Sequence, residues 1–110
     1  MALTLPFRRG QLVVVVLHSP KERLWGVLLG LDGPGLAIRG LDVAAWEEVL
    51  TLVRQGQADF VSLSTKFLPM HRIESLYLDE RSSGVPSLGE VFRDRTGLDP
   101  AAFLSGEEEA

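Results

Sequence analysis

A proline-centred break between two alternating segments constrains this 110-residue chain more than any other feature. The segment before the break ends near Phe67, and the segment after it runs from Arg72 to Leu78. Proline has no backbone N–H to donate to a neighbouring strand, so Leu68-Pro69-Met70 predicts the end of one strand and a tight turn into the next. We expect the rest of the chain to supply the strands with which these two segments pair.

Three further strands are predicted before this pair. The continuous β-branched run from Gln11 to His18 is typical of a strand buried on both faces. A second strand is expected over Arg23 to Leu31 and a third over Leu36 to Leu41, joined by the turn at Asp32-Gly33-Pro34-Gly35. Alternation then resumes at Asp59 and predicts a fourth strand that reaches Leu68.

Two glycines inside the second strand indicate a strongly bent sheet. Gly26 and Gly30 fall on the face opposite Trp25, and a glycine inside a strand usually marks a bend or a close backbone approach. A strand that bends in this way suits a small closed barrel. The predicted fold class is therefore mainly β, a five-stranded antiparallel barrel.

Helical patterns interrupt the strands in two places. Asp42 and Gly56 stand as an N-cap and a stop around apolar residues at helical spacing, which predicts an inserted helix near residues 43–55. Ser87 and Glu90 match a capping box, and Asp99-Pro100 matches the start of a second short helix. The chain is predicted to form a single domain over residues 1–110, with the barrel over 11–80, a C-terminal helical appendage over 87–105 and an acidic tail over 106–110.

Composition excludes several classes of function. The chain has no cysteine, which removes disulfides, thiolate metal sites and cysteine nucleophiles. His18 and His71 lack the spacing of metal ligands, so we expect no metal and no other cofactor. Nothing in the sequence places two carboxylates for acid–base work, so no enzymatic activity is expected. The longest apolar run, Leu12 to Leu17, is too short for a bilayer, and the expected location is cytoplasmic without a membrane partner.

Two segments resemble motifs of the Sm-like (LSm/Hfq-like) family of small β-barrel proteins. Residues 23–32 resemble the family's second strand, in which a glycine precedes an apolar run that an aspartate closes. Residues 66–76 resemble its second motif, and their His71-Arg72-Ile73 portion is most similar to the bacterial RNA-chaperone branch. The resemblance spans residues 11–80 apart from the inserted helix. It implies an Sm-like/SH3-like barrel whose subunits assemble into a ring.

Several positions of the family's RNA-binding motif carry other residues here. The Asp-x-x-Met-Asn signature would fall on residues 32–36, where Gly35 replaces the methionine and Leu36 replaces the base-contacting asparagine. The stacking aromatic would fall near Pro34, and Met70 stands at the position of the lysine that precedes the pore histidine. The family also places its helix before the first strand. These departures remove base-contacting residues and leave the strand pattern intact.

Two functions are compatible with a barrel of this kind. One is a non-catalytic scaffold or protein-interaction module, binding a second copy or another protein, because a small barrel leaves two edge strands that can pair between subunits. The residues expected at the contacts between subunits are Val61, Leu63, Phe67, Ile73 and Tyr77. The alternative is an RNA-binding protein that uses the loop between strands four and five. The expected RNA contacts are Lys66, His71, Arg72 and Arg39.

The charged and aromatic residues that could contact RNA can also be explained by roles within the fold. The net charge of −4 argues against general nucleic-acid binding, and DNA is not an expected partner. Arg72 could pair with Glu74 or Asp79 instead of a phosphate. Trp25 and Trp46 could stack on bases, but their apolar faces favour packing in the core.

Overall fold

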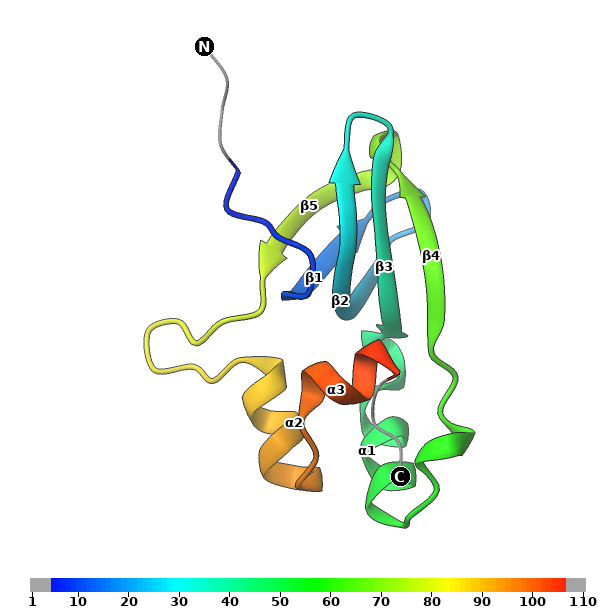
Figure 1. The fold of residues 1–110 in the computed structure, drawn as a ribbon, viewed down its shortest axis with the longest axis vertical. Helices are drawn as coiled ribbons and strands as arrows, with labels where there is room; N and C mark the ends of the chain where they lie inside the picture. The colour runs from blue at the N-terminus through cyan, green and yellow to red at the C-terminus, as the bar shows by residue number, and fades with distance from the viewer. Residues whose placement is uncertain (1–4, 107–110) are drawn as a thin grey trace.

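The computed structural model describes residues 5–106 and contains one five-stranded sheet with helices gathered at one end of it (Figure 1). The strands are β1 (Leu12–Leu17), β2 (Glu22–Asp32), β3 (Gly35–Asp42), β4 (Ser64–Pro69) and β5 (Ile73–Leu78). The α-helices are α1 (Trp46–Arg54), α2 (Leu88–Thr96) and α3 (Pro100–Ser105). Three 3-10 turns complete the elements: η1 (Val43–Ala45), η2 (Ala58–Phe60) and η3 (Met70–Arg72).

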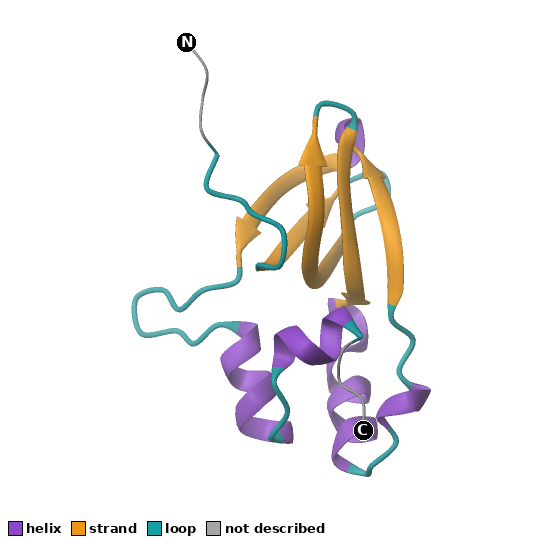
Figure 2. Ribbon diagram, viewed as in Figure 1, coloured by secondary structure: helices purple, strands orange, loops and turns teal. Residues whose placement is uncertain are grey.

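Helices and strands contribute comparably to the domain, and Figure 2 shows the three α-helices below the strands, while the short helical turn η3 lies at the top of the sheet. The domain is therefore mixed α/β, and the prediction of a mainly β chain was wrong in this respect. The helices are not peripheral, because they supply buried side chains to the core. No helix within residues 5–106 is long and apolar enough to cross a membrane.

The strand order in the sheet is β4-β3-β2-β1-β5, and each neighbouring pair is antiparallel. Five antiparallel strands are thus confirmed. The strands curve, and β5 arches away from the plane of β2 and β3 (Figure 1). Closure is not observed, because a closed barrel needs a ladder between its first and last strands and none joins β4 to β5 within residues 5–106.

The two faces of the sheet bury two separate apolar clusters. The inner cluster is built from the strands, and its buried members are Val13, Val15, Leu17, Leu24, Leu28, Leu36, Ile38 and Leu68. The outer cluster joins strand residues to the helices, and its buried members are Val14, Trp25, Val27, Leu41, Val49, Leu50, Val53, Phe92, Phe103 and Leu104. Because both faces are covered, β1 is buried from Val13 to Leu17, as its continuous β-branched run predicted.

A close backbone approach between β2 and β3 accompanies the bend. Gly26 lies opposite Gly40, and a Cβ atom on either residue would collide with the backbone of the other strand. The interpretation of Gly26 as a point of close approach is confirmed. Gly30 has open space around it and follows a register shift at Leu29, so the second irregularity of β2 is a bulge.

The fourth strand is shorter than predicted. Pairing with β3 begins at Ser64, and residues 58–60 form η2 where a strand was expected. Val61 and Leu63 then pack against the outer cluster from a loop. The apolar alternation before Ser64 therefore reflects contacts with the core, which a loop can make as well as a strand can. Inside β4 the buried residue is Leu68.

The inserted helix starts and stops where its caps predict. The Asp42 side chain accepts a hydrogen bond from the backbone N–H of Ala44 at 2.8 Å, and the helical stretch runs over residues 43–54 as η1 and α1. Gly56 lies just beyond the end with a φ of 76°. That left-handed conformation suits glycine, which has no Cβ to clash.

The two C-terminal helices complete the outer cluster. Phe92 of α2 is fully buried, and its ring centroid lies 5.5 Å from that of Trp25 and 5.0 Å from that of Phe103. Trp46 of α1 meets Trp25 edge to face at 5.2 Å. Both tryptophans therefore have packing roles, and the segment expected to be an appendage is part of the core. The acidic tail falls largely outside the described residues.

Candidate functional site

The edge strands β4 and β5 each have one side with no strand partner within residues 5–106. Met70 donates its backbone N–H to the carbonyl oxygen of Pro34 at 2.8 Å. Since inward and outward groups alternate along an antiparallel strand, the backbone groups of Leu68 and Lys66 face β3, and those of Phe67 and Thr65 point outward. Outward-facing N–H and C=O groups make an edge strand a template for pairing with another chain.

Each edge also carries an exposed aromatic side chain. Phe67 on β4 is 59% exposed and Tyr77 on β5 is 43% exposed. Phe67 lies opposite Ala37 in the register, and Tyr77 lies opposite Val14, so both project from the outer face of the sheet. The helices pack on that face at one end of the sheet, around Trp25 and Leu41, and leave these two rings exposed.

The other three residues expected at subunit contacts are half-buried. Val61 and Leu63 precede β4 and are half-buried against the outer cluster. Ile73 begins β5 but is half-buried against the inner cluster. Of the five residues predicted for this interface, the structure therefore places Phe67 and Tyr77 as exposed side chains on the open edges.

Arg72 is engaged within the fold. Its Nη2 donates to the carbonyl oxygen of Pro20 at 2.9 Å, its Nε donates to the carbonyl oxygen of His18 at 3.3 Å, and the carboxylate of Glu22 lies 3.9 Å away. These contacts tie η3 to the turn between β1 and β2. The expected partners Glu74 and Asp79 form no ion pair with Arg72 in the part of the chain that the structure describes.

The four predicted RNA contacts do not converge. His71 is exposed on η3, and Lys66 is exposed on β4. Arg39 pairs with Thr65 in the register, one position along from the pair of Ile38 and Lys66, so Arg39 and Lys66 project to opposite faces. Together with the engagement of Arg72, this leaves no continuous basic strip among these residues.

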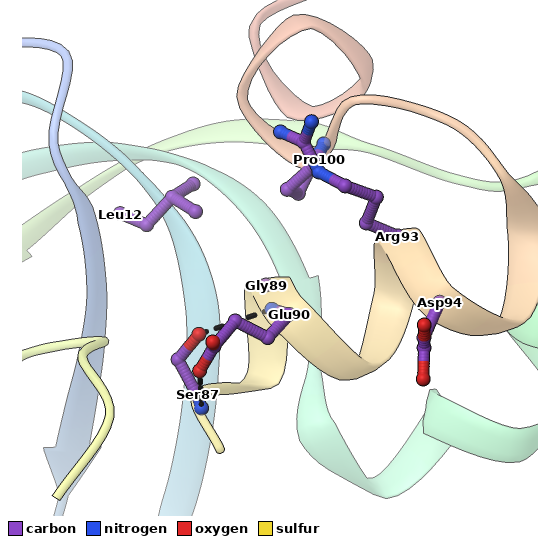
Figure 3. Close-up of a pocket in the computed structure, with 7 residues that line it drawn as sticks. All are labelled: Leu12, Ser87, Gly89, Glu90, Arg93, Asp94 and Pro100. Atoms are coloured by element: carbon purple, nitrogen blue, oxygen red, sulfur yellow. Dashed lines mark hydrogen bonds between the residues drawn. The ribbon is translucent and has the colours of Figure 1, made fainter.

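A hollow of about 390 Å³ lies beside the start of α2 (Figure 3). Ser87 and Glu90 on its wall hold each other in the predicted capping box, and Arg93 bonds to Asp99. The hydrogen bond from the backbone N–H of Ser87 lowers the pKa of Glu90, and Arg81 lowers it further. Glu90 is therefore an ionised cap at neutral pH, which does not suit it to act as a general acid.

Asp79 is a polar group with several partners that was absent from the predicted sites. Its carboxylate accepts hydrogen bonds from the indole of Trp25 and from two backbone N–H groups at the start of α2. An acid directly after a strand and shortly before a capped helix was the signal that could have found it. Within residues 5–106, no group of three or more histidine, aspartate or glutamate side chains is placed to hold a metal ion.

Comparison with protein-family models, with curated proteins and with solved structures found no match to this chain.

Proposed function

We propose that this domain is a non-catalytic scaffold of the Sm-like/SH3-like open-barrel kind that assembles with copies of itself through β4 and β5. The observation that carries the proposal is the pair of open edges at opposite ends of one bent sheet, each with an exposed aromatic ring. Contact between two different edges is head-to-tail, and such contacts close into rings when the rotation between subunits allows it.

Assembly through the edges would remove two costs of the isolated chain. Pairing would satisfy the outward backbone groups of Thr65 and Phe67. It would also cover the rings of Phe67 and Tyr77, and aromatic side chains are enriched at protein interfaces because they bury much area with few rotatable bonds. Pro69 supplies no donor, so the new ladder is expected to end there.

Light scattering coupled to size-exclusion chromatography tests the proposal. The full chain is expected to elute as a multiple of the monomer mass, and Phe67→Ser should shift the population towards monomer. Phe60→Ser is the matched control, because Phe60 is 71% exposed but lies in η2, outside the strands that are expected to pair. A strictly monomeric wild-type chain at high concentration would overturn the proposal, and so would equal effects of the two variants.

The alternative is an Sm-like RNA-binding protein that contacts RNA through η3. The exposure of His71 and Met70, side by side at this turn, favours it. Fluorescence polarisation with short U-rich and A-rich RNA should then show salt-dependent binding that His71→Ala weakens and His18→Ala does not. The absence of such binding at concentrations on the order of tens of micromolar would exclude this function.

A further inference from the structure

Arg39 carries a buried donor without an acceptor. The residue lies on β3 and is half-buried, and its Nε atom is buried with no hydrogen-bond partner within residues 5–106. None of the ion pairs among these residues includes it. A buried N–H on a charged group is costly to leave unpaired, and an unpaired group of this kind calls for a ligand or a water.

Arg39 is one of the residues that line a cavity of about 260 Å³. Val61, Leu63 and Phe103 supply apolar walls, and Asp59 also lines the space. Gly106, the C-cap of α3, lies directly against the guanidinium, since a Cβ atom built on it would be 3.1 Å from Nη2. The cavity thus brings together β3, the loop before β4 and the end of α3.

We propose that this cavity binds a carboxylate, with Arg39 as its cationic anchor. A planar guanidinium matches a carboxylate through two parallel N–H···O bonds, and the Nε edge that is unpaired here is one of the edges that can form them. The apolar walls suit the aliphatic stem of such a ligand. Asp59 in the same space disfavours the greater negative charge of a phosphate. Arg39 is thereby assigned to a carboxylate and not to RNA.

Two sources can supply this carboxylate. The sequence continues from Gly106 directly into Glu107, Glu108 and Glu109, so three carboxylates follow the residue that touches the guanidinium. The other source is a separate molecule with a carboxylate on a short aliphatic chain. The proposal is independent of the self-assembly described above, because β3 is an interior strand of the sheet.

A double-mutant cycle followed by thermal melting tests the internal source. Arg39→Met and the triple change of Glu107, Glu108 and Glu109 to Gln should each lower the melting temperature by on the order of 5 °C. The combined variant should lose no more than either alone. Fully additive losses, or no loss with the Gln variant, exclude the tail as the source. The same three Glu→Gln changes should also shift the NMR signal of the Arg39 Nε–H group, a readout that altered packing in the Arg39→Met variant cannot mimic.

The external source is tested in the Glu→Gln variant. Sodium butyrate should raise the melting temperature above that in sodium chloride of equal ionic strength, and Arg39→Met should abolish the rise. Inorganic phosphate should raise it less than butyrate does. The proposal is overturned when neither source shows an effect that depends on Arg39, or when phosphate stabilises the chain as well as butyrate.

Discussion

Asp79 accepts a hydrogen bond from the indole Nε1 of Trp25 at 2.9 Å, and this contact joins the residue after β5 to the middle of β2. The same carboxylate accepts the backbone N–H groups of Leu88 and Gly89 at 2.8 and 2.7 Å. The first N–H groups of a helix have no acceptor within the helix, so Asp79 satisfies two of them at the start of α2. One side chain therefore sets α2 against the sheet.

Replacement of Asp79 should destabilise the domain measurably. Asp79→Ala leaves the indole N–H and two helix N–H groups without their acceptor, and we expect the free energy of unfolding to fall by about 1–3 kcal/mol. Chemical denaturation followed by tryptophan fluorescence measures this change. Glu80→Ala, at the exposed neighbouring residue, is the control and should have little effect. Equal effects of the two substitutions would contradict the role given to Asp79.

The C-terminal helices should be required for the stability of the whole domain. Phe92→Ala removes a fully buried ring that contacts Trp25, and the expected loss is about 3–5 kcal/mol of unfolding free energy. Val85→Ala, in the exposed loop before α2, should be nearly neutral. Urea unfolding measures both. If Phe92→Ala left the fluorescence of Trp25 and the unfolding midpoint unchanged, α2 would not be part of the core.

The close approach of β2 and β3 should make one glycine sensitive and another tolerant. Gly40→Ala places a Cβ against the backbone of β2, and strain of this kind is expected to cost about 1–3 kcal/mol. Gly30→Ala meets nothing within 4 Å and should be tolerated. The melting temperatures of the two variants, compared with that of the wild type, test this prediction. A Gly40→Ala variant as stable as the wild type would show that β2 and β3 can move apart.

Stability should depend on pH through the cap of α2. The pKa of Glu90 is lowered in the folded chain from its ordinary value of 4.5, so its stabilising contribution is present above pH 4.5. The contribution is lost as the pH falls through the lower folded value. The difference in stability between the wild type and Glu90→Gln should therefore be largest at neutral pH and shrink below pH 4.5. A difference that grows in acid would contradict this assignment.

Local patterns predicted the elements well because each has a local physical cause. The caps at Asp42, Ser87 and Asp99 form hydrogen bonds within a few residues, so the sequence around each is sufficient to identify them. The continuous run in β1 likewise follows from burial on two faces. The predicted start of β4 was wrong for the opposite reason. Val61 and Leu63 are apolar because they contact distant parts of the chain, and not because they lie in a strand.

The candidate site was harder to predict because it depends on which partners the fold brings together. Arg72 reaches carbonyl groups more than fifty positions earlier in the chain, and the Asp79 carboxylate meets Trp25 across a similar separation. Arg39 and Lys66 look like one basic patch in sequence terms, but the strand register sends them to opposite faces. The exposure of Phe67 and Tyr77 at open edges follows from the strand order, which no local pattern encodes.

Amide hydrogen exchange at Thr65 and Phe67, followed over a dilution series of the full chain, tests self-assembly through the sheet edges most directly. Their N–H groups point away from β3, so only a second chain can protect them by strand pairing. The account predicts slow exchange at high concentration and fast exchange on dilution, with the interior strand β2 protected throughout. Fast exchange of these two amides at every concentration would contradict it.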